Sequence, residues 1–237
     1  KMNPENRSII WKLNDEFLIL LILIIVTFIS LFLANFTNIL VLSFFFYPAT
    51  ILPIFYLSFW KYKMNLKLTL KSLGFIYPSK NLKVKSIIIQ QISPYILATY
   101  AWIIGLLFVG IWIYLINYFS ISLFNPPILE EAIPKFPSNS FIVFCLIAMF
   151  IAPICEEILF RGFLLKKISS KYGPRKSILI TSIIFALFHI DLGAIIPVLI
   201  LGLSIGWVKI KTDSLLPCIG IHIIQNSLAI ILSISNI

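Results

Sequence analysis

Residues 156–161 read Glu-Glu-Ile-Leu-Phe-Arg and place two carboxylates and a guanidinium inside the apolar run from Phe141 to Leu165. A charged side chain at membrane depth costs at least about 2.5–3.5 kcal/mol unless it is paired or faces a wet cavity. On a helix, Glu157 and Arg161 lie four residues apart on one face, so they are predicted to pair with each other. Glu156 points about 100° away from that face. The stretch therefore predicts one structural ion pair and one carboxylate that is available for chemistry.

The composition indicates a polytopic membrane protein. Of the 237 residues, 60% are hydrophobic and 12% are charged, and the mean hydropathy is +1.03. A soluble domain has about half its residues apolar and about a quarter charged. The net charge of +10 would suggest a nucleic-acid partner in a soluble protein, but here the lysines lie in short segments between apolar runs, as in cytoplasmic loops. Nucleic-acid binding is therefore disfavoured.

Alternating apolar runs and polar segments predict a single membrane domain over residues 1–237, with seven or eight helices. Two lysine-rich segments, Lys61–Lys85 and Lys166–Lys176, are predicted to be cytoplasmic together with the N-terminus. In chain order, the predicted spans are 17–34, 39–60, 95–116, 139–165, 177–190, 194–208 and 215–235.

Two parts of this pattern are irregular. The stretch 86–94 contains Gln90, Gln91 and Pro94, and it is predicted to be an interfacial lead-in that helps to form the entrance to the site. The fifth and sixth runs are shorter than the roughly 20 residues that cross a bilayer. The turn between them, residues 191–193, is therefore predicted to lie below the outer surface, where irregular backbone must be buried in protein or line a wet cavity.

The chain has two histidines, and both belong to patterned positions. His189 follows Phe185 by four residues, and His222 precedes Asn226 by four, so that His222 and Asn226 project from one helix face. Counting about 1.5 Å per residue from the nearest loop residue puts Glu156 about 15 Å deep, His189 about 20 Å and His222 about 13 Å. These groups are predicted to converge near the midplane, with access from the cytoplasmic side or laterally from lipid.

Three motifs, EExxxR, FxxxH and HxxxN, occur in this order on three predicted helices. Together they resemble the CAAX protease and bacteriocin-processing family (CPBP, also called Abi) of glutamate-type intramembrane endopeptidases. All three motifs are present without substitution. The resemblance covers residues 139–235, which form the predicted catalytic core.

The resemblance implies an all-α bundle with an intramembrane active site and no metal or other cofactor. By similarity, Glu156 would be the general base that activates water, and His189 would position or polarise that water. His222 and Asn226 would stabilise the oxyanion of the tetrahedral intermediate.

The resemblance also implies that Glu157 and Arg161 hold the site together. Elementary chemistry agrees with these roles, because peptide hydrolysis needs a base within reach of water and donors aimed at the developing oxyanion. An imidazole and an amide one helical turn apart supply such donors. The chain shows no serine or cysteine nucleophile with a base at matched spacing.

Two alternatives remain open. Two histidines and one glutamate form a known catalytic zinc set, so Glu156, His189 and His222 are also candidate ligands in a zinc hydrolase, although the chain has no HExxH motif. The other alternative is a non-proteolytic membrane protein of the same fold, such as an immunity factor, scaffold or transporter.

The predicted partners are the lipid bilayer and a membrane-bound or lipidated peptide or protein. The family resemblance allows either a prenylated CAAX protein or a bacteriocin or signalling peptide. The abundance of Ile, Lys, Asn and Phe is typical of an AT-rich bacterial genome and favours the second class, in a bacterial plasma membrane.

Overall fold

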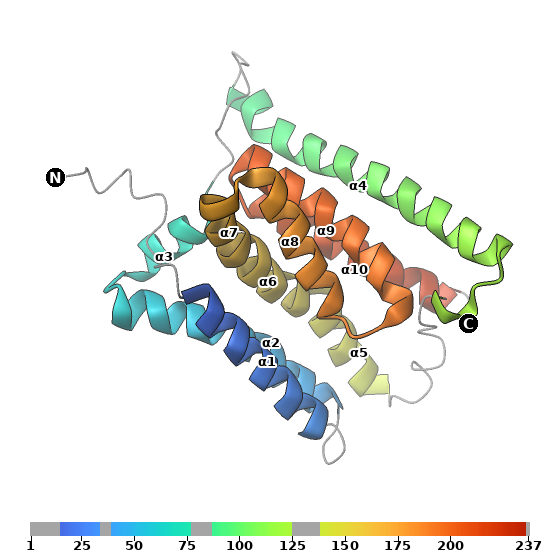
Figure 1. Cartoon of the computed structure of the whole chain (residues 1–237), viewed down its shortest axis with the longest axis horizontal. Coiled ribbons are helices and arrows are strands. Elements are labelled where there is room, and N and C mark those ends of the chain that lie inside the picture. The colour runs from blue at the N-terminus through green and yellow to red at the C-terminus, as the bar shows by residue number, and fades with distance from the viewer. Residues whose placement is uncertain (1–14, 34–38, 77–86, 125–137, 236–237) are drawn as a thin grey trace.

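The computed structural model describes residues 15–33, 39–76, 87–124 and 138–235, and within these ranges every regular element is a helix (Figure 1). The predicted all-α bundle is therefore confirmed. Its α-helices are α1 (Asp15–Leu33), α2 (Ile39–Tyr56), α3 (Leu66–Leu73), α4 (Ile87–Tyr118), α5 (Ser138–Leu146), α6 (Ala152–Glu157), α7 (Leu165–Tyr172), α8 (Pro174–Leu187), α9 (Leu192–Thr212) and α10 (Leu216–Ser235). Residues 34–38 and 125–137, which lie between predicted spans, and the side chains of Gln90 and Gln91 lie outside the described residues.

One long helix runs through the middle of the bundle. It joins α5, α6 and α7 through two π-helical segments, η6 (Ile147–Ile151) and η7 (Ile158–Leu164). In Figure 1, α1 and α2 lie along one edge of the molecule and α4 along the opposite edge, with this central helix and α8, α9 and α10 between them. The two neighbouring glutamates end α6, so they are held inside the bundle.

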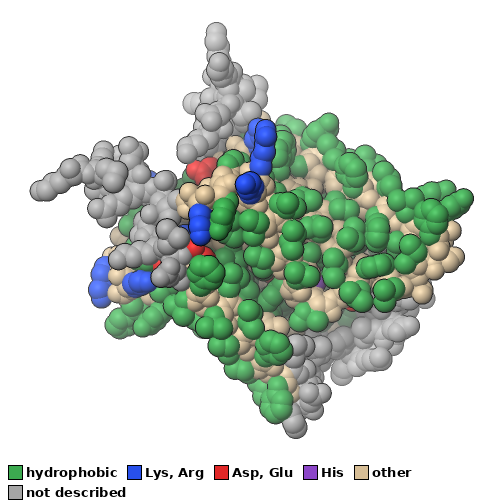
Figure 2. Space-filling model, in the orientation of Figure 1, with side chains coloured by type: hydrophobic (Ala, Val, Ile, Leu, Met, Phe, Trp, Pro, Cys, Tyr) green, Lys and Arg blue, Asp and Glu red, His purple; other side chains and the backbone are tan. Residues whose placement is uncertain are grey.

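Several helices are long and apolar enough to cross a membrane. Within the described residues these are Leu42–Lys61, Ile92–Tyr118, Phe141–Tyr172 and Leu192–Thr212, and Leu216–Leu232 is a shorter apolar helix. Apolar side chains cover most of the face shown in Figure 2. An integral membrane protein is therefore the class that the sequence and the fold both support.

Two spans differ from the sequence prediction. The expected division near Pro94 is absent, and α4 runs unbroken through this residue. Proline removes one backbone N–H, but apolar helices within a bundle tolerate that loss. The sixth predicted span, 194–208, corresponds to α9, which is 21 residues long because both of its ends extend beyond the apolar run. The side chain of Asp191 accepts a hydrogen bond from the backbone N–H of Ala194, and Lys209 is buried and donates to the carbonyl of Asp213, so both ends are capped.

The lysine-rich segments meet at one end of the bundle, which we call the basic end. Lys166 donates to the carbonyl of Ser72 in α3, and the N–H of Leu215 donates to the carbonyl of Gly74. In Figure 2 the Lys and Arg side chains that face the viewer lie over the part of the molecule that contains α3 and α7. The prediction that the two basic segments share one side agrees with these contacts.

Gly74 allows α3 to dock at the basic end, which gives a first prediction. Its φ of +102° is strained for any residue with a side chain, and an added Cβ would lie 2.5 Å from Nζ of Lys209. We expect Gly74→Ala to lower the free energy of unfolding by at least about 1–2 kcal/mol. Thermal unfolding in detergent measures this loss. Gly110→Ala is the matched control, because a Cβ there meets nothing within 4 Å. Equal stability of the two variants would contradict the docked arrangement.

Candidate active site

The first motif, EExxxR, contributes a buried ion pair between Glu157 and Arg161 next to the site. Nη1 of Arg161 donates to Oε1 of Glu157 at 2.9 Å, and both side chains are fully buried. The predicted pairing within one helix face is therefore present. The same carboxylate oxygen accepts a second hydrogen bond, at 2.8 Å, from Nδ1 of His222 on α10. The ion pair thus joins the central helix to the helix that carries the third motif.

Arg161 is satisfied from three directions. Besides the bond to Glu157, Nη2 donates to the carbonyl of Gly202 at 3.3 Å, and the guanidinium lies 4.3 Å from the ring centroid of Phe185. The carbonyl of Gly202 is within reach because α9 packs closely on α8 there: a Cβ at Gly202 would lie 3.0 Å from Cβ of Ser182. A cation over an aromatic face is favourable and is stronger away from water.

Glu156 has different surroundings from its neighbour. It keeps 12% side-chain exposure, whereas Glu157 keeps none. Its Oε2 lies 3.5 Å from Nε2 of His222, so this imidazole stands between the two carboxylates. Because the Glu157 carboxylate can only accept, Nδ1 of His222 carries the proton of that bond. Glu156 therefore lies outside the Glu157–Arg161 ion pair and contacts His222 from the other side of the ring.

His189 lies just beyond the C-terminal end of α8. Its Nδ1 is 2.9 Å from the carbonyl of Phe185, which can only accept, so Nδ1 carries a proton, and in a neutral ring Nε2 is then the acceptor. The ring packs edge-on against Phe185, with centroids 4.9 Å apart. Phe185 also makes an edge-on contact with the ring of His222 at 5.8 Å. The first residue of FxxxH thus orients the groups of all three motifs, a role that the sequence analysis did not assign.

Asn226 reaches the central helix where the backbone lacks a donor. The N–H of Ala152 donates to the carbonyl of Ile147, five residues back, which is the π-helical pattern. The next residue, Pro153, has no N–H to offer to the carbonyl of Ala148. The side-chain amide of Asn226 donates to this carbonyl instead, at 2.9 Å. One amide proton is used in this way, and an amide carries two.

The four candidate catalytic side chains line one cavity of about 330 Å³, which we call the site cavity. They are Glu156, His189, His222 and Asn226. The sequence prediction that these groups converge agrees with this geometry. A group of three or more His, Cys, Asp or Glu side chains arranged to hold a metal ion is not found within the described ranges.

Other polar groups of the site were missed or left without a role by sequence reasoning. Tyr47 of α2 lines the site cavity, and nothing in its local sequence marks it. Gln225 accepts a hydrogen bond from the indole N–H of Trp102 at 2.7 Å, which ties α10 to α4. Neither contact follows from helical spacing, because each depends on a neighbour far away in the chain.

The fold and the site define a polytopic membrane protein with a cluster of acidic, basic and amide groups at membrane depth. Residues 138–228 match the family described as type II CAAX prenyl endopeptidase, Rce1-like. The match covers less than half of the chain but includes all three motifs, and it confirms the predicted resemblance. Comparisons with curated proteins and with solved structures gave no match. Residues 138–228 are therefore similar to a family described as CAAX-type endopeptidases.

The shared carboxylate of Glu157 gives a second prediction. Glu157→Gln keeps the shape but leaves the buried guanidinium of Arg161 without a counter-charge, so we expect a loss of about 3–5 kcal/mol in unfolding free energy. Asp213→Asn makes the same kind of change in the partly exposed pair with Lys209, where we expect at most about 1 kcal/mol. Unfolding of both variants in one detergent tests this difference. Similar losses would contradict a structural role for the buried pair.

Proposed function

We propose that this protein is an intramembrane endopeptidase in which Glu156 activates water to hydrolyse a peptide bond of a membrane-associated peptide or protein. The observation that carries the proposal is the gathering of Glu156, His189, His222 and Asn226 around one cavity inside an apolar bundle. The substrate classes considered are a prenylated CAAX protein and a bacteriocin or signalling peptide.

In the proposed reaction, water lies between Glu156 and Nε2 of His189. Glu156 takes a proton from the water as its oxygen bonds to the carbonyl carbon of the substrate. The negative charge that develops on the carbonyl oxygen is stabilised by the second amide proton of Asn226 and by Nε2–H of His222 in the form of the ring that carries a proton on both nitrogens. The proton then passes from Glu156 to the amine nitrogen as the C–N bond breaks, so that an acid and an amine are released.

The surroundings of these groups support their proposed roles. The Glu157 carboxylate, which is paired with Arg161, binds Nδ1 of His222, and the Ala148 carbonyl binds the amide of Asn226. Both side chains are therefore fixed before the substrate binds. Fixed donors stabilise a developing charge without having to reorganise.

The third prediction tests the proposed base. Glu156→Gln is expected to lower kcat/KM for cleavage of a membrane peptide by about 10²–10⁴-fold, because general-base catalysis contributes that much. His222→Ala should lower it as well. Purified protein in nanodiscs is incubated with lipidated and unlipidated peptides, and products are identified by mass spectrometry.

Glu16→Gln is the matched control, because it makes the same change at the basic end, near Lys167. It should leave cleavage unchanged, and the unfolding temperature of every variant is measured so that rates are compared only where the protein is folded. Each reaction is repeated with a zinc chelator. Cleavage that stops with the chelator would favour the zinc hydrolase over the glutamate mechanism. No cleavage by the wild type of any peptide would favour a binding or immunity role.

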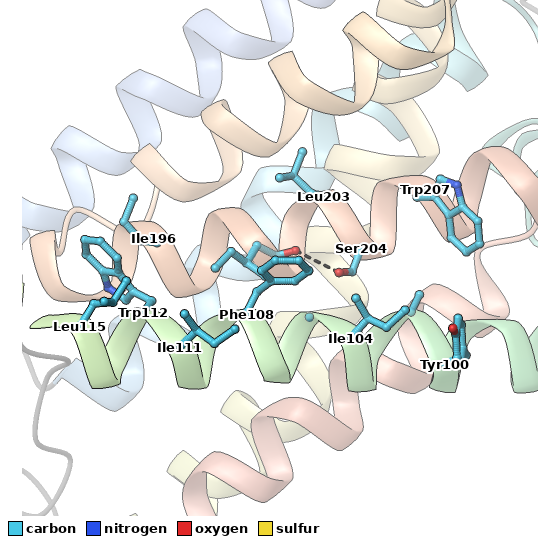
Figure 3. A pocket seen from close by; sticks show the side chains of 13 residues that line it. Tyr100, Ile104, Phe108, Ile111, Trp112, Leu115, Ile196, Leu203, Ser204 and Trp207 are labelled. Atoms are coloured by element: carbon cyan, nitrogen blue, oxygen red, sulfur yellow. Dashed lines mark hydrogen bonds between the residues drawn. The ribbon is translucent and has the colours of Figure 1, made fainter.

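A groove beside the site supports a substrate with a hydrocarbon chain. It has a volume of about 660 Å³ and lies between α4 and α9 (Figure 3). From Tyr100 to Leu115 it follows fifteen residues of α4, or about 22 Å. Its lining is almost entirely apolar, and the hydroxyl of Ser204 is already bonded to the carbonyl of Ile200. Gly105 and Ser204 line both the groove and the site cavity, so a chain lying in the groove would pass beside the site cavity.

The fourth prediction tests this groove with two neighbouring isoleucines. Ile104 lines the groove, whereas Ile103 is exposed and does not. Ile104→Trp should fill the groove and lower kcat/KM for a lipidated peptide by about tenfold, the equivalent of losing burial of about two methylene groups. The rate for the same peptide without lipid should not change. Ile103→Trp should change neither rate, and an equal loss in both variants would exclude the groove as the binding place of the chain.

A further inference from the structure

Gln225 faces the site cavity but has no part in the proposed reaction. It lies between His222 and Asn226 on α10, where every third or fourth side chain from His222 to Ile230 lines the cavity. Across the cavity, α4 presents a stripe of its own with the same spacing, made of Trp102, Gly105, Leu106 and Val109. Gln225 is thus a polar side chain on the face of α10 that carries two of the candidate catalytic groups.

Trp102 fixes the orientation of this amide. Its indole N–H donates to Oε1 of Gln225 at 2.7 Å. Because an indole nitrogen can only donate, the oxygen of the amide faces it, and both amide protons point away from it. Nε2 of Gln225 has no acceptor in the part of the chain that the structure describes. The two protons are therefore available to a group that enters the cavity.

A hydrogen bond between two membrane helices often serves only to join them. Joining α4 to α10 would use the oxygen of Gln225 and leave its amide N–H groups unused. An amide donor without an acceptor is unfavourable in apolar surroundings. Water can accept from Gln225 in the empty cavity, and it is displaced when a ligand brings an oxygen of its own. The backbone of a peptide substrate supplies such oxygens.

The two neighbouring amides of α10 point to opposite walls of the cavity. Asn226 donates to the Ala148 carbonyl of the central helix, whereas Gln225 reaches Trp102 of α4. A peptide that crosses from one wall to the other passes both amides. In an extended chain, carbonyls on the same edge recur at every second residue, about 7 Å apart. The carbonyls of a helix, in contrast, are already bonded within the helix.

We infer that Gln225 binds the backbone of the substrate. Its amide donates to the peptide carbonyl two residues from the scissile bond, while Asn226 faces the scissile carbonyl itself. Trp102 acts through Gln225 and is a positioning residue. The form of the substrate follows: it is extended, not helical, where it is cut. The inference rests on the proposed function for the identity of the scissile bond, but binding through Gln225 does not need that bond to be cleaved.

The test is a scan of the peptide backbone against two variants. Gln225→Met removes both the contact with Trp102 and the amide donors, whereas Trp102→Phe removes the contact and leaves the donors. Each peptide bond of a fluorescent, lipidated peptide is replaced in turn by a trans-alkene, which keeps the shape of the bond but has no carbonyl. Binding is measured by fluorescence anisotropy with the Glu156→Gln protein in nanodiscs, so that nothing is cleaved, and empty nanodiscs give the blank.

We expect one replacement to weaken binding by about five- to tenfold, the effect of one lost hydrogen bond. Gln225→Met should weaken binding of the unmodified peptide by the same factor and should make binding insensitive to that replacement. Trp102→Phe should weaken binding less and keep the sensitivity. Equal losses in both variants, with the scan unchanged by Gln225→Met, would mean that Gln225 only joins two helices and would overturn the inference.

Ile224→Met is the matched control, because this neighbouring side chain of α10 is exposed and does not line the cavity. It should leave binding unchanged. Thermal unfolding in detergent shows whether each variant is folded. If Gln225→Met unfolds, Gln225→Glu takes its place, because an ionised carboxylate still accepts from Trp102 but cannot donate.

Cleavage of the same peptides by the protein with Glu156 intact separates the inference from the proposed function. The bond that responds to Gln225→Met should lie two residues from the cut, and a responding bond next to the cut would overturn the extended arrangement. Binding that depends on Gln225 without cleavage leaves the inference and counts against the protease. Cleavage whose kcat/KM ignores Gln225→Met leaves the protease and overturns the inference. Neither binding nor cleavage of any peptide overturns both.

Discussion

The structure depends on the burial of one guanidinium inside an apolar bundle. A charge in such a place must be matched on every side, and no single helix can do this. Arg161 finds a carboxylate on its own helix, a carbonyl on α9 and an aromatic face on α8. The carboxylate then binds the imidazole of α10. Satisfying one side chain therefore sets the positions of four helices, and these are the helices that carry or support the motifs.

This arrangement lets two adjacent glutamates do different work. Glu157 is enclosed, and two donors fix one of its oxygens, so its charge serves the fold. Glu156 is one step around the helix, where the bundle is hollow, and it touches the same imidazole from the other side. Neighbouring positions in the chain thus supply a buried structural carboxylate, Glu157, and an accessible one, Glu156. Helical geometry alone accounts for the division, because consecutive side chains point about 100° apart.

Sequence reasoning predicted most of this site because intramembrane charges are costly and their spacing on a helix is regular. The Glu157–Arg161 pair follows from local spacing, and the gathering of both histidines and Glu156 around one cavity follows from their similar predicted depth. Sequence reasoning could not predict contacts between residues far apart in the chain. Examples are the hydrogen bond from Arg161 to the Gly202 carbonyl and the packing of Leu73 of α3 against Gly162. Sequence reasoning also placed the end of the sixth span too early, because a buried lysine reads as a loop residue until its partner is known.

The gap that Pro153 leaves in the central helix sets the height of α10. Asn226 supplies the missing donor, and its hydrogen bond to the Ala148 carbonyl fixes the position of α10 along the central helix. His222 lies one helical turn from Asn226, so the same bond also helps to hold His222 beside Glu156 and Glu157. The third motif therefore positions α10 along the central helix and also supplies two polar groups to the site. The irregular backbone of the central helix at Ala148 thus determines where α10 packs along it.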